Sequence, residues 1–157
     1  MNPVAVVARQ LSQCSGLMDE NMTATASHFI LYVADQERSA AFYSKVLGIQ
    51  PRLHVPGMTE FVLPGSGILG LMPEQGIRKL LGPGLPDPAA AQGIPRAEVY
   101  LVVGEPGAHH ARAIDAGAKE FSPMLQRNWG HAAAYSLDPD GHVLAFASAA
   151  VPLRTVE

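Results

Sequence analysis

Two side chains at matching places in the chain, His28 and Glu98, have the residue types best suited to chemistry. Each stands near the start of a stretch whose apolar and polar residues alternate as in a strand. At such a position His28 can donate a hydrogen bond to a ligand or act as a base near neutral pH. A carboxylate on the inward face of a strand is unfavourable unless paired, so Glu98 indicates a partner or a function. The alternatives are a structural histidine bonded to Glu98 or water, and a glutamate exposed at a strand end.

Aromatic residues accompany both side chains. By strand alternation Tyr32 shares the face of His28, and Tyr100 shares the face of Glu98, which predicts a concave surface with aromatic and polar groups. Either tyrosine is equally compatible with a core position from which its hydroxyl reaches water. Trp129 is the only tryptophan and precedes Gly130 at the entrance of a predicted hairpin.

The remaining reactive residue types form no catalytic group. Cys14 lies outside the repeated part of the chain, and no serine stands in a Gly-x-Ser-x-Gly elbow, so no nucleophile and no catalytic residue is assigned. Adjacent helical residues diverge by about 100°, so we expect His109 and His110 to be solvated rather than to share a metal. We interpret Asp-Pro-Asp-Gly before His142 as a structural turn, with His142 on the surface.

The elements that would position these residues follow one order twice. The first unit predicts a strand at 27–35, a helix capped by Asp35 and ended by Gly48, and strands at 50–55, 59–63 and 68–72. About 70 residues later come a strand at 97–103, a helix from Pro106 to Ala116 stopped by Gly117, and strands at 119–125, 131–137 and 142–148. The predicted fold class is therefore α+β, with two tandem βαβββ modules.

The predicted organisation has an N-terminal extension at 1–26, module one at 27–72, a linker at 73–96, module two at 97–151 and a tail at 152–157. The linker is rich in proline and glycine, with a short helix possible at 77–81. A linker of this length indicates either a lid over a site or a plain spacer between the modules.

Composition limits the classes of partner. The 157 residues carry a net charge of −3 without a basic stripe, so no nucleic acid is expected. The single cysteine, Cys14, allows no intrachain disulfide, which fits a reducing cytoplasm. No apolar run reaches the roughly 18 residues of a spanning helix, and no basic signal region opens the chain. We expect an unexported cytoplasmic protein without a membrane partner.

The order of elements and several motifs resemble the vicinal oxygen chelate superfamily, which includes glyoxalase I, extradiol dioxygenases and bleomycin-resistance proteins. The motifs are His28 to Asp35, Phe42-Tyr43 followed by Leu47-Gly48, and Trp129-Gly130 followed by Asp138-Pro139-Asp140-Gly141-His142. The resemblance covers about residues 27–151 and implies a curved, half-barrel-like mixed sheet with a cleft.

In metal-using members of this superfamily, ligands come from the first and fourth strands of each module. The resemblance places His28 and Glu98 at two such positions, but Leu71 and Ala145 at the other two. A divalent metal normally needs three or more protein ligands. Two ligands would hold it weakly unless His54, His131 or a linker carboxylate joined them, so we expect no metal and no cofactor.

The function we predict is metal-independent binding or sequestration of a small aromatic or apolar molecule by a homodimer, similar to bleomycin resistance, a form of antibiotic resistance. The resemblance implies that Trp129 stacks on the ligand; the alternative is a tryptophan that plugs the sheet edge. The competing functions are a metal-dependent glyoxalase-type lyase or isomerase in which Glu98 moves a proton, and an interaction module whose cleft is filled by its own side chains. The predicted ligand-binding residues are His28, Tyr32, Phe61, Glu98, Tyr100 and Trp129.

Overall fold

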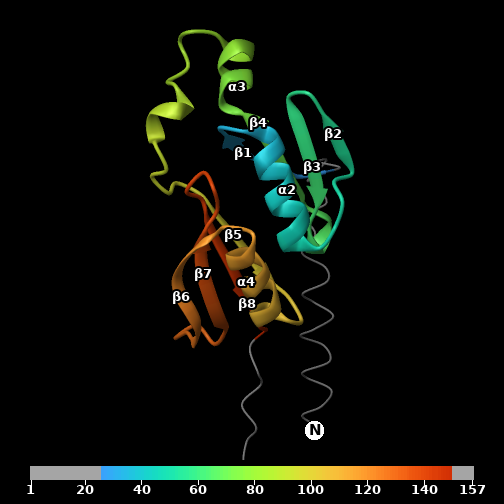
Figure 1. Cartoon of the computed structure of the whole chain (residues 1–157), viewed down its shortest axis with the longest axis vertical. Coiled ribbons are helices and arrows are strands. Elements are labelled where there is room, and N and C mark those ends of the chain that lie inside the picture. Colours follow the sequence, from blue (N-terminus) through green and yellow to red (C-terminus); the bar gives the residue numbers. More distant parts are fainter. Residues whose placement is uncertain (1–25, 150–157) are drawn as a thin grey trace, which may run out of the picture.

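A computed structural model describes residues 26–149 of the chain (Figure 1). Cys14, the tail and nearly all of the N-terminal extension lie outside the described residues. Within this range the predicted α+β fold of two βαβββ units is confirmed, with a separate four-stranded mixed sheet in each unit. Both sheets are open.

Module one consists of one α-helix, four strands and the 3-10 turn η1 (Pro64–Ser66) before the last strand. Helix α2 (Gln36–Leu47) begins where the Asp35 carboxylate accepts a hydrogen bond from the Arg38 backbone N–H, and it ends at Gly48, which has a φ of 68°. Both predicted ends of the helix are confirmed. Aspartate suits the first position because its short acidic side chain satisfies free backbone N–H groups, and glycine suits the last because it tolerates a positive φ. The strands are β1 (His28–Val33), β2 (Leu53–Val55), β3 (Met58–Val62) and β4 (Ile68–Pro73).

Module two repeats this order. Helix α4 (Pro106–Asp115) has no side-chain cap at Glu105, unlike its counterpart, and the chain turns at Gly117 with a φ of 106°. The strands are β5 (Glu98–Val102), β6 (Lys119–Gln126), β7 (Ala132–Leu137) and β8 (Val143–Ala147).

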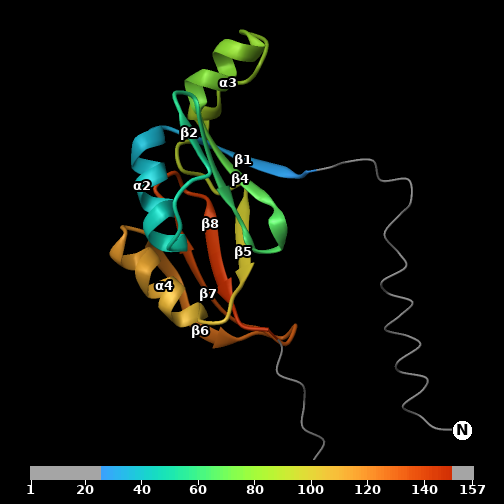
Figure 2. The same ribbon diagram turned by 90° about the vertical axis from the view of Figure 1, so that its right-hand side faces the viewer.

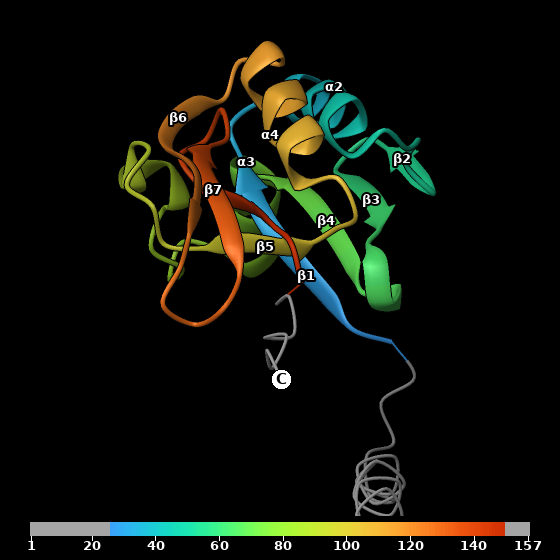
Figure 3. The same ribbon diagram turned by 90° about the horizontal axis from the view of Figure 1, so that it is seen from below.

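The two sheets have the same topology. Their strand orders are β1-β4-β3-β2 and β5-β8-β7-β6. The pairs β1–β4 and β5–β8 are parallel, and all other pairs are antiparallel. Strands β1 and β5 are therefore both edge strands. Seen from below, they cross near the middle of the molecule (Figure 3).

One hydrophobic core joins the modules. Helices α2 and α4 lie side by side on the same side of the molecule (Figures 2 and 3). The Lys45 ammonium donates to the Asp115 carbonyl at 3.0 Å, and the Arg112 guanidinium donates to the Val46 carbonyl at 3.3 Å. Beneath the helices, a single cluster of buried residues contains Leu31 and Tyr43 of module one together with Leu101 and Phe146 of module two.

The linker carries more helix than the sequence predicted. Helix α3 (Glu74–Leu81) begins three residues earlier than expected, and the 3-10 turn η2 (Pro88–Ala91) follows it. An ion pair between Arg78 and Asp87 joins these two elements. From there the chain descends to β5 and passes the turn between β7 and β8, where Gly93 lies against Gly141.

Candidate functional site

The two faces of each sheet have different environments. Leu31 and Val33 of β1 and Val99 and Leu101 of β5 are buried beneath the helices. Because side chains alternate along a strand, the neighbouring residues His28, Ile30, Tyr32, Glu98, Tyr100 and Val102 belong to the opposite faces. We call these the open faces of module one and module two.

A groove of about 930 Å³ lies between the edge strands β1 and β5. Its walls are mostly apolar and include Phe29, Ile30, Leu69 and Leu101. The predicted residues Glu98 and Tyr100 both line it, and the turn before β4 closes one side. Phe29, with 67% of its surface exposed, is the most accessible large apolar side chain in the groove. This groove is the principal candidate site.

An aromatic group covers the open face of module two beside the groove. The Trp129 indole N–H donates to the Tyr100 hydroxyl at 3.2 Å, and that hydroxyl lies 2.9 Å from Nδ1 of His131. The Arg127 guanidinium lies over the ring of Tyr135, 4.9 Å from its centroid. Arg127, His131 and Tyr135 were not predicted as site residues, although the alternation in β7 places Tyr135 on the open face.

His28 has a different partner from the one considered in the sequence. Its Nδ1 lies 3.4 Å from the carboxylate of Glu60, which also accepts from Nε of Arg52 at 2.8 Å. Glu98 lies in the groove instead, so the structure does not join His28 and Glu98 as a pair. The three side chains of this group stand on the open face of module one.

The structure also separates Tyr32 and Phe61 from the groove. Tyr32 lines a second pocket, beyond Ile30, together with residues of the linker and the turn before β8. Phe61 is fully buried in the core, where it lies near Tyr43 beneath α2. Because β3 carries apolar residues on both faces, its sequence did not reveal which face Phe61 takes. We therefore leave Phe61 out of the proposed site.

The residues at the family's metal positions do not fit a metal. Ala145 stands on the open face of module two, but its β-strand neighbours are Tyr100 and Tyr135, and it has no exposed surface. In module one the strand register makes Gly70, opposite Ile30, the counterpart of Ala145, whereas Leu71 is buried in the core. Across residues 26–149, no group of three or more histidine, cysteine, aspartate or glutamate side chains could hold a metal ion.

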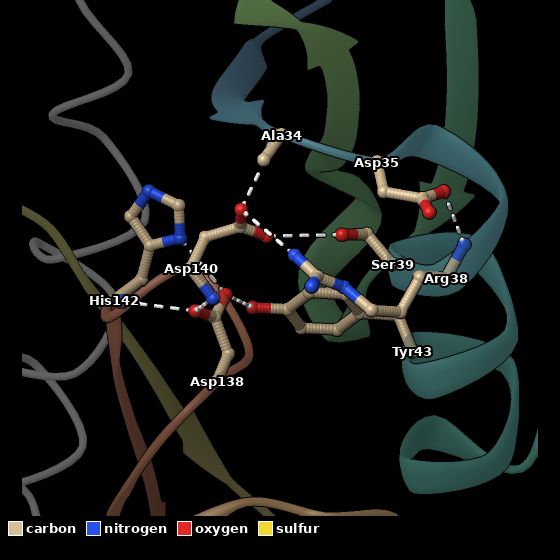
Figure 4. Close-up of polar contacts among 8 residues, drawn as sticks. All are labelled: Ala34, Asp35, Arg38, Ser39, Tyr43, Asp138, Asp140 and His142. Carbon is tan, nitrogen blue, oxygen red and sulfur yellow. Dashed lines mark hydrogen bonds and ion pairs between the residues drawn. The ribbon is translucent and has the colours of Figure 1, made fainter. Parts of the chain in front are cut away.

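The turn between β7 and β8 forms a polar junction between the modules (Figure 4). The Asp138 carboxylate accepts from the Tyr43 hydroxyl at 2.7 Å and faces Nδ1 of His142 at 2.8 Å. Asp140 reaches the start of α2, where it accepts from the Ala34 backbone N–H at 2.8 Å and from the Ser39 hydroxyl at 3.0 Å. The predicted structural turn thus also connects the two modules.

The titratable groups at this junction shift one another's pKa values. Burial alone would raise the pKa of Asp138, but its hydrogen bonds and the nearby His142 outweigh burial and lower it. Burial alone would lower the pKa of His142, but Asp138 outweighs burial and raises it. Burial, followed by the charge of Asp138, raises the pKa of Tyr43 well above its usual value. Asp138 and His142 are therefore stabilised as an ion pair.

Two expectations about histidines were wrong. His142 is not on the surface, because its bond to Asp138 holds the ring in a junction where the side chain is only 16% exposed. His110 is buried on α4 and its Nε2 contacts the Glu120 carboxylate at 2.7 Å, so it is not solvated as predicted. The partners are close in the sequence, four residues from His142 and ten from His110, but the sequence does not show that these side chains meet.

Comparison with known proteins agrees with this architecture. The family model of the glyoxalase/bleomycin resistance protein/dioxygenase superfamily matches residues 25–146. The chain belongs to this superfamily, as the resemblance in the sequence had indicated. No curated protein matches the chain significantly.

Solved structures show the same fold. A glyoxalase-related enzyme from Fulvimarina pelagi is 21% identical, with a TM-score of 0.64 over 79% of this chain and 87% of the other. A glyoxalase/bleomycin resistance protein/dioxygenase from Nocardioides is 24% identical, with a TM-score of 0.62 over 96% and 98%. TioX from Micromonospora sp. ML1 is 20% identical, with a TM-score of 0.55 over 80% and 98%.

In residues 26–149 no helix is long and apolar enough to cross a membrane.

Proposed function

We propose that this protein binds a small aromatic or apolar molecule in the groove between β1 and β5 without a metal. The observation that carries the proposal is the groove itself, whose mainly apolar walls include only a few polar side chains, among them Glu98 and Tyr100. Small-molecule sites typically have this composition and volumes of roughly 300–1,000 Å³. Apolar contact would supply most of the affinity, and the two polar side chains would orient the ligand.

Trp129 would report on this binding and contribute to it. Its ring is 55% exposed and its indole N–H contacts the Tyr100 hydroxyl, which belongs to a residue of the groove. A ligand that moves Tyr100 would change the environment of the indole. The contact also supports the predicted role of Trp129 as a side chain beside the ligand.

The test is titration with the neutral aromatic dye N-phenyl-1-naphthylamine, followed by dye and tryptophan fluorescence. We expect binding that Phe29→Ala weakens by about tenfold or more, since burial of a large apolar side chain contributes roughly 1.5–3 kcal/mol. Phe121→Ala is the matched control, because Phe121 is 62% exposed on β6 and lies outside the groove. Equal affinity in Phe29→Ala and the unaltered protein would contradict the groove as the site.

We also propose a homodimer that covers the open face of module one. Ile30, Leu53, Val55 and Val62 each leave more than a third of their surface exposed on this face, and exposed apolar patches of this kind mark interaction sites. Multi-angle light scattering should give a dimer mass for the unaltered protein and a monomer mass for Val62→Lys. Leu80→Lys, on α3, should remain dimeric; a monomeric unaltered protein would refute the proposal.

A further inference from the structure

The groove between β1 and β5 contains a single charge. Among the described residues that line it, Glu98 is the only one with an ionisable acidic or basic group, and the other polar side chains are Ser27, Ser66 and Tyr100. A neutral ligand that covered Glu98 would remove water from a carboxylate without replacing it, which is unfavourable. The groove therefore favours a ligand that supplies a partner for this carboxylate.

The Glu98 carboxylate has no partner within the part of the chain that the structure describes. It is exposed at the start of β5 and forms no ion pair with any residue in the range 26–149. Arg96, two positions earlier, lines the second pocket instead of the groove. His28 on β1 contacts Glu60 at 3.4 Å. The carboxylate is therefore free to bind a ligand.

Aromatic rings stand beside this carboxylate on the open face of module two. Tyr100 follows Glu98 by two positions on β5, and Tyr135 lies across β8 from Tyr100, with 6.5 Å between the ring centroids. Burial, and then the charge of Glu98, raise the pKa of Tyr135, so the carboxylate acts on this part of the face. The faces of aromatic rings carry negative potential and attract cations. The carboxylate and the rings thus favour the same sign of charge.

Arg127 shows that this face of the sheet accommodates a cation. Its guanidinium lies over the ring of Tyr135, 4.9 Å from the centroid. The same guanidinium donates to the Ala133 carbonyl at 2.8 Å and to the Ser122 hydroxyl at 2.7 Å, which holds it outside the groove. Because Arg127 is bound to these acceptors and not to Glu98, the groove keeps its negative charge.

We propose that the groove selects lipophilic organic cations, which are molecules with an aromatic or apolar body and one positive charge. The body would pack against Phe29, Leu69 and Leu101, and the cationic group would lie against the Glu98 carboxylate beside the ring of Tyr100. An anion of the same shape would be repelled by this carboxylate. The inference rests on the proposed function and narrows its ligand from apolar molecules in general to cationic ones.

The test is calorimetric titration of the full chain at pH 7 with three compounds that share a naphthalene body. They are 2-(1-naphthyl)ethylamine, 2-(1-naphthyl)ethanol and 1-naphthylacetate. The amine is positively charged at this pH, because an alkyl ammonium has a pKa of about 10, as in lysine. We expect the amine to bind at least about tenfold more tightly than the alcohol, and the acetate to bind most weakly, because charges beside apolar walls are screened less than in water.

Two further comparisons test whether Glu98 causes this preference. Glu98→Gln should reduce the ratio of amine affinity to alcohol affinity to about one. Glu105→Gln is the matched control, because it removes an equal charge from an exposed position outside the groove and should keep the ratio. Added salt should weaken binding of the amine but not of the alcohol, since salt screens exposed charges.

Four results would each overturn the inference: equal binding of amine and alcohol by the unaltered protein, tighter binding of the acetate, a ratio that survives Glu98→Gln, or an amine affinity that salt does not change. Binding of the alcohol or of N-phenyl-1-naphthylamine without a preference for the amine would refute this inference alone. If neither the dye nor any of the three compounds binds, the proposed function fails and the inference fails with it.

Discussion

Asp138 is a single buried carboxylate that contacts both modules. It accepts from Tyr43 on α2, from His142, and from the backbone N–H groups of Asp140 and His142 at 2.9 Å each. Four donors around one carboxylate offset the unfavourable burial of its charge. Removing one of these donors should therefore lower the stability of the junction between the modules.

Tyr43→Phe tests this dependence. The substitution keeps the aromatic ring in the core but leaves a buried carboxylate with one donor fewer, so we expect the free energy of unfolding to fall by about 1.5–3 kcal/mol. Urea denaturation measures the loss. Tyr32→Phe is the control, because no hydrogen bond involves the Tyr32 hydroxyl in the described structure and its loss should change stability little. An equal loss of unfolding free energy in the two variants would contradict a stabilising role for the contact between Tyr43 and Asp138.

The His142 ion pair predicts a pH dependence with two limits. The pKa of His142 is raised on folding, so its contribution is complete below about pH 6.5 and is lost as pH rises through the raised value. The pKa of Asp138 is lowered, so its contribution is present above about pH 4 and is lost as pH falls through the lowered value. The pair therefore stabilises most between these limits.

His142→Gln should accordingly lower the free energy of unfolding more at pH 5.5 than at pH 9. Denaturation curves of both proteins at the two pH values give the difference. A penalty that does not change with pH would show that His142 acts through packing alone.

At the scale of elements, the helix ends could be predicted, whereas the buried face of β3 could not. Asp35 and Gly48 act locally, through hydrogen bonds and a positive φ within one turn of α2. The side that Phe61 faces depends instead on how β3 is placed against α2. The sequence assigned Leu71 as the counterpart of Ala145 by counting from the turn glycine, whereas the strand register assigns Gly70. The two disagree because the turns before β4 and β8 differ.

The side-chain contacts of the candidate residues could not be predicted from the sequence either. Asp138 and Tyr43 lie 95 positions apart, and the contact depends on the packing of module two against α2. Glu98 and Tyr100 were predicted by alternation and do share the groove, whereas His28 contacts Glu60 on another strand. Alternation assigns a face to a residue, but it does not identify the neighbour across the sheet.

The turn before β8 also fixes the linker. A Cβ at Gly141 would lie only 2.2 Å from the Gly93 carbonyl oxygen according to the backbone geometry, and its φ is 88°. Gly141→Ala should therefore lower the midpoint of thermal unfolding more than Gly117→Ala, since Gly117 has a φ of 106° but nothing within 4 Å. The positive φ alone costs roughly 1–2 kcal/mol in either variant. Similar midpoints would show that the linker moves aside freely.

At the scale of the whole molecule, the shared core predicts that the modules unfold together. Leu31 and Phe61 belong to the same buried cluster as Leu101 and Phe146, so losing either module exposes the core of the other. Amide hydrogen exchange should show similar maximal protection in β4 and β8. Markedly weaker protection of one strand would indicate that its module opens separately.

The groove has a further consequence for the molecule in concentrated solution. Strands β1 and β5 are edge strands, and an exposed apolar edge is a template on which other chains can add strands. Here the two edges border the same groove. If the groove binds a ligand as proposed, the bound ligand should cover both edges and slow the aggregation of the protein in concentrated solution.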